Sequence, residues 1–413
     1  MEAYDKEKIS KSELISILDE KIRIEQFLRG EVKELRNNLE IVSNKYVEFF
    51  LRIYRIFRKV SRKIMQSKAS TQLKRNQNEN VKFIKKIDVL LLLPSDKVEI
   101  GGIATAFRLI KELESHNLVV KYCSIAHDPS VQTNDSFVSI NDLSKISEIE
   151  VIVTCGAETL TTANLLKKSN PFIKIVMLVQ GPDPYFTPSW NNAVEYLNSL
   201  KSADRVVAIS PFLKDLVVQW GAKNVAVCTL GPDTEVFKIL NNVTNEARTN
   251  TIIVPCRPNV NKGLNLLLPN LQFLKDLGWN IIGFGILPQH SMANVFDEFY
   301  GLLSDESLCR LLNRGKILID PSSIEGLGRV ALEAAACGCV PIIQKRLSYS
   351  GLFTEDSRPY IEIESFLNPR FLIDALHSAE NFHTPQKLHS LILEVNWQKG
   401  VEEFKKVMSK LKK

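Results

Sequence analysis

The amino-acid sequence predicts an α/β protein made of two doubly wound parallel sheets, with a helical extension in front of them. Three observations support this fold class. Short apolar segments alternate with helical ones from about residue 86, the alternation stops at a polar gap over 241–250, and it then starts again. Strands that alternate with helices indicate a parallel sheet covered by helices. A chain of 413 residues is also too long for one ordinary hydrophobic core.

The first sheet is expected from six apolar segments: Asp88–Leu93, Leu118–Cys123, Glu150–Thr154, Ile173–Val179, Arg205–Ile209 and Val225–Leu230. Helices are expected between them, around 103–114, 158–168, 191–201 and 211–219. The second sheet is expected from Thr251–Cys256, Asn280–Phe284, Lys316–Ile319 and Cys339–Ile343, with helices at 263–277, 306–313 and 328–336. The predicted parts are an extension and linker over 1–80, doubly wound domains over 81–240 and 241–385, and a last helix over 386–413 that packs back on the first domain.

The extension carries the basic character of the protein. The chain holds 53 Lys and Arg against 47 Asp and Glu; residues 1–86 hold 21 against 12, and the remainder holds 32 against 35. A heptad pattern runs through residues 28–60, and the stretch 49–63 mixes aromatic residues with cations and has no acid. Two interpretations of residues 28–66 stay open: a helix on an anionic membrane surface, or a coiled-coil-like helix that packs on the body or on its twin in a homodimer. Nucleic acid is not an expected partner because no recognised binding module is present.

The sequence predicts a cytoplasmic protein, held at the inner face of the membrane if the extension binds lipid. It contains no run of eighteen apolar residues, and its first residues lack the apolar segment of a secretory signal. The seven cysteines are scattered, odd in number and without a Cys-x-x-Cys pair, which indicates reduced, buried thiols. The six histidines suggest no metal site.

Candidate functional residues follow the ends of predicted strands, where open parallel sheets bind their ligands. Gly101 and Gly102 follow the strand at 88–93 and precede a helix. A glycine pair there lets backbone amides approach an anion at a helix N-terminus, although a plain tight turn would also explain it. Arg257 and Lys262 follow the strand at 251–256, and two cations ahead of a helix N-terminus suit a diphosphate. They would also stabilise the charge on a departing nucleotide.

The strand at 316–319 leads into Glu325-Gly-Leu-Gly-Arg-Val-Ala-Leu-Glu333. Glu325 is expected in a loop and Glu333 about one and a half turns into the following helix. A carboxylate beside glycine amides accepts hydrogen bonds from sugar or ribose hydroxyls. A glutamate near a helix start also has a structural role as a partner of the helix dipole.

These segments together resemble retaining glycosyltransferases of family 4, which carry an E-x7-E element in a GT-B fold of two Rossmann-like domains. The resemblance rests on Arg257-x4-Lys262-Gly, on the stretch from Pro321 to Pro341 that contains Glu325 and Glu333, and on segments near 207–213 and 230–237. It covers residues 86–400.

The resemblance implies that Arg257 and Lys262 hold the diphosphate of a nucleotide-diphosphate sugar and act in catalysis together with Glu325, which binds the transferred sugar. It also implies donor-binding roles for the backbone amides of Gly326, Leu327 and Gly328 and for the turn at Gly101 and Gly102. Glu333 would bind the ribose of the nucleotide. It implies a transfer with retention and without a metal ion or other cofactor, and the lack of any Asp-x-Asp in the chain fits this.

One departure concerns the acceptor side. Many family members have a histidine after the strand that precedes the acceptor cleft, whereas this chain has Gln180-Gly-Pro-Asp183-Pro-Tyr-Phe. This arrangement resembles the subset that includes bacterial rhamnan rhamnosyltransferases, which favours a deoxyhexose donor such as rhamnose. Gln180 and Asp183 are therefore the candidates for positioning the acceptor hydroxyl, with loop structure as the alternative. Pro258 directly after Arg257 is a second departure.

The function expected from the sequence is the transfer of a hexose or deoxyhexose to a growing cell-surface glycan, free or lipid-linked. A Ser-His-Asp hydrolase is not favoured, because no Gly-x-Ser-x-Gly elbow occurs. Two alternatives remain: a GT-B nucleotide-sugar epimerase, which needs no acceptor, and a non-catalytic scaffold of a glycan-assembly complex.

Overall fold

The computed structural model of the chain describes residues 86–96, 101–116, 118–128, 130–131, 133–146, 148–182, 190–240, 248, 250–287 and 290–411. The predicted extension, with its helix over residues 28–66, lies outside this part of the chain. The expectation of a membrane-surface or dimer helix therefore stays a prediction.

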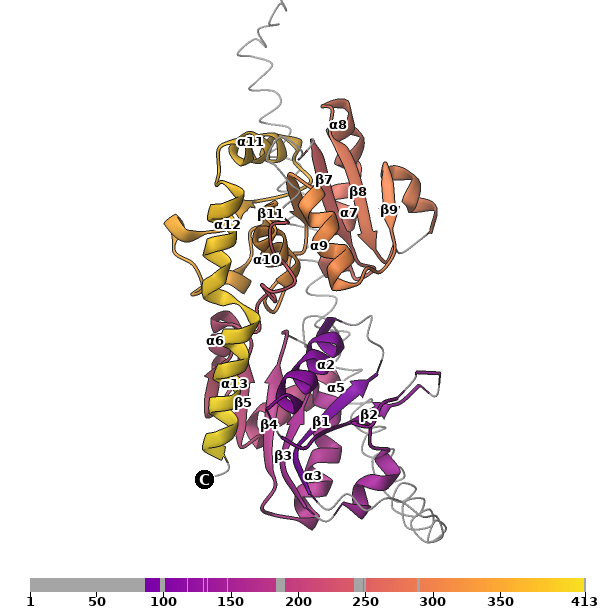
Figure 1. Cartoon of the computed structure of the whole chain (residues 1–413), viewed down its shortest axis with the longest axis vertical. Helices are drawn as coiled ribbons and strands as arrows, with labels where there is room; N and C mark the ends of the chain where they lie inside the picture. The colour runs from indigo at the N-terminus through magenta and orange to yellow at the C-terminus, as the bar shows by residue number, and fades with distance from the viewer. Residues whose placement is uncertain are drawn as a thin grey trace, which may run out of the picture. The chain divides into compact units, whose positions relative to one another are not determined.

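The first half of the described chain forms a sheet of six parallel strands in the order β2-β1-β3-β4-β5-β6 (Figure 1). Its strands are β1 (Ile87–Ser95), β2 (Val120–Ala126), β3 (Ile149–Thr154), β4 (Lys174–Val179), β5 (Arg205–Ala208) and β6 (Val225–Val227). Its helices are α2 (Gly101–Glu114), α3 (Leu160–Ser169), α5 (Trp190–Ser202) and α6 (Pro211–Gln219). All six strands and all four helices were expected from the sequence, with ends that differ by a few residues.

Strand β1 shows why these segments are unbroken apolar runs. Leu90, Leu91 and Leu92 are all fully buried, although successive side chains of a strand point to opposite faces of the sheet. Leu91 belongs to one hydrophobic core, and Leu90 and Leu92 belong to another. Both faces of the sheet are therefore covered, as a parallel sheet requires.

The second half forms another parallel sheet, in the order β12-β11-β10-β7-β8-β9. Its strands are β7 (Thr251–Cys256), β8 (Asn280–Gly285), β9 (Glu298–Tyr300), β10 (Ile317–Asp320), β11 (Val340–Gln344) and β12 (Ile361–Ile363). Its helices are α7 (Leu264–Leu267), α8 (Leu271–Asp276), α9 (Asp305–Arg314), α10 (Arg329–Ala336), α11 (Pro369–Glu380), α12 (Pro385–Ile392) and α13 (Trp397–Leu411). The sequence did not predict β9, β12 or α11.

The helix expected over 263–277 is interrupted. A 3-10 turn over Leu268–Asn270 separates α7 from α8, and it contains Pro269. A proline inside a helix removes one backbone donor and clashes with the preceding turn, so the single helix was a wrong prediction. The helical tail is likewise divided into α12 and α13 by a short 3-10 turn over Leu393–Val395.

Helix α13 contacts residues of the first half of the described chain. The Trp397 backbone N–H donates to the carbonyl of Pro232 at 2.8 Å. The guanidinium of Arg108, on α2, lies 5.4 Å from the centre of the Trp397 ring. No helix in the described part of the chain is long and apolar enough to cross a bilayer.

Candidate functional site

The two predicted cations lie at the carboxyl edge of the second sheet. Arg257 directly follows β7, and Lys262 ends a 3-10 turn ahead of α7. The Arg257 guanidinium donates from Nη1 to the Cys256 carbonyl at 3.0 Å and lies 5.9 Å from the centre of the Phe284 ring. These contacts hold the guanidinium at the strand end. Both cationic side chains are half-buried.

Gly285, at the end of β8, makes room for Arg257. Its φ is +111°, a conformation that favours glycine, and an added Cβ would lie 2.5 Å from Arg257 Nη1. The same Cβ would overlap the Cys256 carbonyl oxygen. The position of the guanidinium therefore depends on the lack of a side chain at Gly285.

Lys262 and Glu325 form an ion pair with each other. Lys262 Nζ lies 2.7 Å from Glu325 Oε1, and the two side chains are 24% and 18% exposed. The family resemblance assigned Lys262 to the donor diphosphate and Glu325 to the transferred sugar. It did not predict that the two residues contact each other. The pair places a cation and an acceptor oxygen side by side, where a ligand with a phosphate next to a hydroxylated ring would find partners for both.

The loop that carries Glu325 is fastened to the segment that carries Lys262. Ser323 donates to the Asn261 carbonyl from its backbone N–H at 2.9 Å and from Oγ at 3.2 Å. Gly263, at φ +66°, lies against the Pro321 carbonyl, and a Cβ would overlap that oxygen. These contacts fix the position of Glu325 relative to Lys262.

The glycines after Glu325 meet the end of β4. A Cβ on Gly326 would overlap the backbone carbonyl of Gln180, and the Gly326 carbonyl accepts a hydrogen bond from Ser210 Oγ at 2.8 Å. Leu327 points its side chain into the core and is 2% exposed. Gly328 caps α10 in the left-handed region with a φ of +67°. The Gly326–Gly328 turn is therefore held by both halves of the described chain.

A buried ion pair lies behind this loop. Asp320, the last residue of β10, contacts Arg346 at 2.8 Å, and both side chains are nearly inaccessible. Arg346 also donates to the Ser322 carbonyl at 3.1 Å, and Tyr349 donates to the Gly328 carbonyl at 2.6 Å. Burial raises the pKa of the Asp320 carboxyl, but the Arg346 charge and hydrogen bonds from Arg346 and Ser322 outweigh burial, so this pKa lies below its usual value.

Arg346 was not predicted as a site residue, although its position in the sequence could have indicated it. It stands two residues after the apolar strand β11, at the same carboxyl edge as Arg257. The rule that selected Arg257, a cation just after a strand end, selects Arg346 as well. Its role here is to support the loop, since its guanidinium is buried against Asp320.

Glu333 is buried on α10, 3% exposed, one turn after Arg329. Its Oε1 accepts from Arg329 Nη2 at 3.0 Å, and Arg329 Nη1 donates to Thr105 Oγ1 on α2 at 2.8 Å. Arg329 therefore connects the carboxylate to the first half of the described chain. The family resemblance implied that Glu333 binds the ribose, and it did not predict this partner.

Gly101 and Gly102 are the first residues of α2, not part of a turn before it as the sequence suggested. Gln180 directly follows β4, and its Nε2 donates to the Gly102 carbonyl at 3.0 Å. The structure thus brings Gln180, Gly102 and Gly326 together. Asp183 lies outside the described residues, so its place beside Gln180 stays a prediction.

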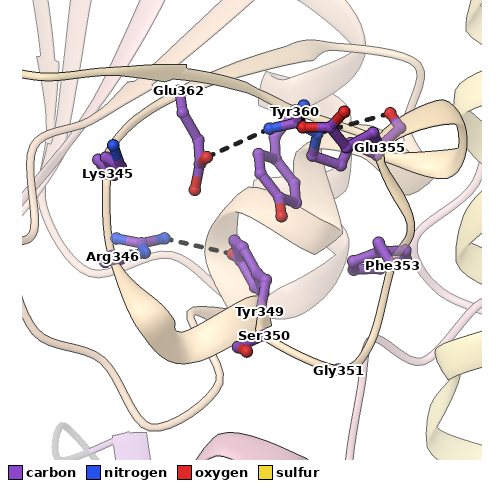
Figure 2. A pocket seen from close by; sticks show the side chains of 10 residues that line it. Lys345, Arg346, Tyr349, Ser350, Gly351, Phe353, Glu355, Tyr360 and Glu362 are labelled. Atoms are coloured by element: carbon purple, nitrogen blue, oxygen red, sulfur yellow. Dashed lines mark hydrogen bonds and ion pairs between the residues drawn. The ribbon is translucent and has the colours of Figure 1, made fainter.

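A pocket of about 510 Å³ lies beside the loop-supporting pair. Figure 2 shows Arg346 and Tyr349 along one side of it and Glu362 and Tyr360 on another. Its remaining lining residues are Lys345, Ser350, Gly351, Phe353, Glu355 and Arg358. None of the residues predicted from the sequence lines this pocket. Within the described part of the chain, no group of three or more His, Cys, Asp and Glu side chains is arranged to hold a metal ion.

No protein-family model matches the sequence, and no protein of curated function aligns with it significantly. Solved structures do resemble it. Sucrose-phosphate synthase from Thermosynechococcus elongatus superposes with a TM-score of 0.64 at 13% identity, over 78% of this chain and 99% of that one. The Anabaena protein HepE in complex with UDP-glucose gives 0.62 at 13% identity, over 78% and 100%. A glycosyltransferase from Rickettsia africae gives 0.60 at 16% identity, over 79% and 98%.

These likenesses decide the fold. The two six-stranded parallel sheets with their helices are the two Rossmann-like domains of a GT-B fold. The GT-B fold that the sequence predicted is confirmed. What such a fold does depends on its site, and the activity is therefore argued from Arg257, Lys262 and Glu325 below.

Proposed function

We propose that this protein is a glycosyltransferase that moves a hexose or deoxyhexose from a nucleotide-diphosphate sugar to a growing cell-surface glycan. One observation carries the proposal: a GT-B fold places Arg257, and the Lys262–Glu325 ion pair, at the carboxyl edge of its second sheet. Solved structures with a similar fold include HepE in complex with UDP and with UDP-glucose, which supports a nucleotide-sugar ligand. The Gln180 segment favours a deoxyhexose such as rhamnose.

Arg257 and Lys262 neutralise the donor diphosphate in this mechanism. When the donor binds, the Lys262 ammonium turns from Glu325 to a phosphate oxygen, and Glu325 accepts a hydrogen bond from a sugar hydroxyl. The ammonium exchanges one anionic partner for another, so its charge stays paired although the two side chains are only 24% and 18% exposed. The two cations stabilise the negative charge that builds on the nucleotide as it leaves. Their charge takes the place of a divalent ion, and we propose a reaction without a metal.

Glu333 and the turn at Gly326–Gly328 complete the donor site. Arg329 engages one oxygen of Glu333, and the other has no partner among the described residues. We assign that second oxygen to a ribose hydroxyl. The backbone amides of Gly326, Leu327 and Gly328 face the sugar and phosphate.

We propose transfer with retention of the anomeric configuration. The bond from the anomeric carbon to the diphosphate oxygen breaks first, and the acceptor hydroxyl attacks from the same face. The proton of that hydroxyl passes to the departing diphosphate. This path needs no protein nucleophile, and Arg257 and Lys262 stabilise the ion pair along it.

A thermal-shift panel tests the donor assignment. Nucleotide diphosphates and nucleotide-diphosphate sugars, each in the presence of EDTA, should raise the melting temperature, because a ligand that binds only the folded state stabilises it. Nucleosides without phosphate serve as the control. No shift with any of them would contradict the proposal, and a shift that requires Mn²⁺ would contradict the metal-free reaction. A donor whose sugar is epimerised without an acceptor would identify an epimerase instead.

A further inference from the structure

A histidine held by a buried carboxylate lies at the carboxyl edge of the first sheet, outside the donor site. Asp96 directly follows β1 and His127 directly follows β2. His127 Nδ1 makes a hydrogen bond to Asp96 Oδ2. The Asp128 backbone N–H donates to the other carboxylate oxygen at 3.2 Å. Asp96 is 1% exposed, whereas the His127 side chain is 31% exposed.

This geometry fixes what the imidazole offers to a ligand. A carboxylate accepts the hydrogen bond from Nδ1, so Nδ1 carries a proton, and in the neutral imidazole Nε2 presents its lone pair. The buried partner also orients the ring, as carboxylate partners do for functional histidines. In that form, Nε2 of His127 is an oriented hydrogen-bond acceptor.

A partly buried aromatic ring adjoins the imidazole. The centre of the Phe137 ring lies 4.7 Å from the centre of the His127 ring, and Tyr122 packs against Phe137 at 5.4 Å. A partly buried aromatic ring beside a fixed polar group is typical of small-ligand sites. An apolar face with an adjacent acceptor suits a sugar ring, which has C–H faces and hydroxyl edges.

The order of the strands places the Asp96–His127 pair and the donor-binding cations on the same side of the contacts between the two halves of the described chain. Gly326, which follows β10, meets Gln180 after β4, and Gly351, which follows β11, meets Pro211 after β5. From these two contacts and the strand orders, β1 and β2 of the first sheet correspond to β8 and β9 of the second, on the same side of the contacts as β7. Arg257 and Lys262 follow β7. His127 therefore lies on the same side of these contacts as the donor diphosphate would.

We propose that His127, oriented by Asp96, binds a hydroxyl of the glycan acceptor. The proposal rests on the glycosyltransferase function argued above and supplies the acceptor side of the site. His127 Nε2 accepts the hydrogen bond, and Asp96 is a positioning residue that acts through the imidazole.

Three variants and two reactions test the proposal. The variants are His127→Ala, Asp96→Asn and, as a matched control, His377→Ala on an exposed position of α11. One reaction is hydrolysis of the radiolabelled donor by water. The other is transfer of the labelled sugar to a membrane extract of the host cells, with the amount of extract varied.

His127→Ala should lower transfer at limiting extract by about tenfold or more and raise the extract concentration needed for half-maximal rate, since one hydrogen bond to the acceptor is lost. Added imidazole should restore part of the transfer. Donor hydrolysis and donor thermal shifts should stay within about twofold of wild type, because water needs no such contact. His377→Ala should match wild type in both reactions.

Asp96→Asn tests whether Asp96 orients the His127 imidazole or only stabilises the fold. An asparagine amide can donate to Nδ1 and so move the proton to Nε2, which then cannot accept from a hydroxyl. Transfer should fall as in His127→Ala while the melting temperature and donor hydrolysis hold. Unchanged transfer in His127→Ala would overturn the inference, and so would an equal loss of hydrolysis and donor binding. A wild-type protein that neither binds nor hydrolyses a nucleotide sugar would instead refute the proposed function itself.

Discussion

At the scale of single residues, the candidate site depends on where side chains are absent as much as on where they are present. Arg257 keeps its position at the strand end because Gly285 leaves the space for its guanidinium. Glu325 keeps its position because Gly263 and Gly326 let two backbones approach closely. The sequence selected the charged residues by their places after strands. It could not predict the Lys262–Glu325 pair, because 63 residues separate its members and their meeting depends on how neighbouring loops close.

Gly285→Ala tests this account of Arg257. The methyl group would overlap the Cys256 carbonyl and crowd Arg257, and the φ of +111° would be strained. We expect a loss of about 1–3 kcal/mol in the free energy of unfolding, together with weaker binding of a nucleotide diphosphate. Chemical denaturation and a binding titration measure the two effects.

Gly301→Ala is the matched control, because nothing lies within 4 Å of a Cβ there. It should leave both quantities near those of wild type. An equal effect of the two substitutions would show that the space beside Arg257 is not what matters.

At the scale of elements, the sequence predicted long elements well and short ones poorly. Strands such as β1 and β7 are apolar runs bounded by polar residues, which periodicity detects. Strands β9 and β12 have three residues each, too few to show a period. The start of helix α11 could have been predicted, because Asn368 is its N-cap and Pro369 follows, but this signal was overlooked. The pairing of Arg329 with Glu333, four residues apart on α10, was also predictable from helix geometry.

Asp320 and Arg346 connect the ends of β10 and β11 behind the donor loop, and breaking this pair should destabilise the fold. Asp320→Asn leaves a buried guanidinium without its counter-ion, so we expect a loss of about 3–5 kcal/mol in the free energy of unfolding. Lys345→Gln breaks the neighbouring pair with Glu364, whose side chains are 64% and 63% exposed, and should change stability little. Urea unfolding of the two variants makes the comparison.

The pH dependence gives a second measurement on the same variant. The pKa of Asp320 in the folded state lies below that of the unfolded chain. Its contribution is therefore complete above the unfolded pKa of about 3.9 and is lost as pH falls through the folded pKa. Wild-type stability should decrease over this acidic range more steeply than that of Asp320→Asn. Parallel curves would contradict the assignment of the ion pair.

At the scale of the whole molecule, the GT-B body and the basic extension are expected to act separately. The sheets, their order and the candidate donor residues all lie after residue 85. The proposed role of residues 28–66 at a membrane surface or in a homodimer rests on their sequence pattern alone.

A chain without residues 1–80 should keep its nucleotide-sugar binding and lose liposome association or dimerisation. Flotation with anionic and with neutral vesicles tests the first, and light scattering tests the second. Loss of donor binding in the shortened chain would show that the extension belongs to the active fold.

The most direct test of the central claim is turnover of the nucleotide sugar identified by the thermal-shift panel, measured in EDTA for wild type, Arg257→Ala and Lys262→Ala. Wild type should transfer the sugar without a metal ion. Each variant should lose about a hundredfold or more in turnover, the effect expected when one preorganised charge is removed from a leaving group. Rates equal to wild type in both variants would contradict the assignment of this site.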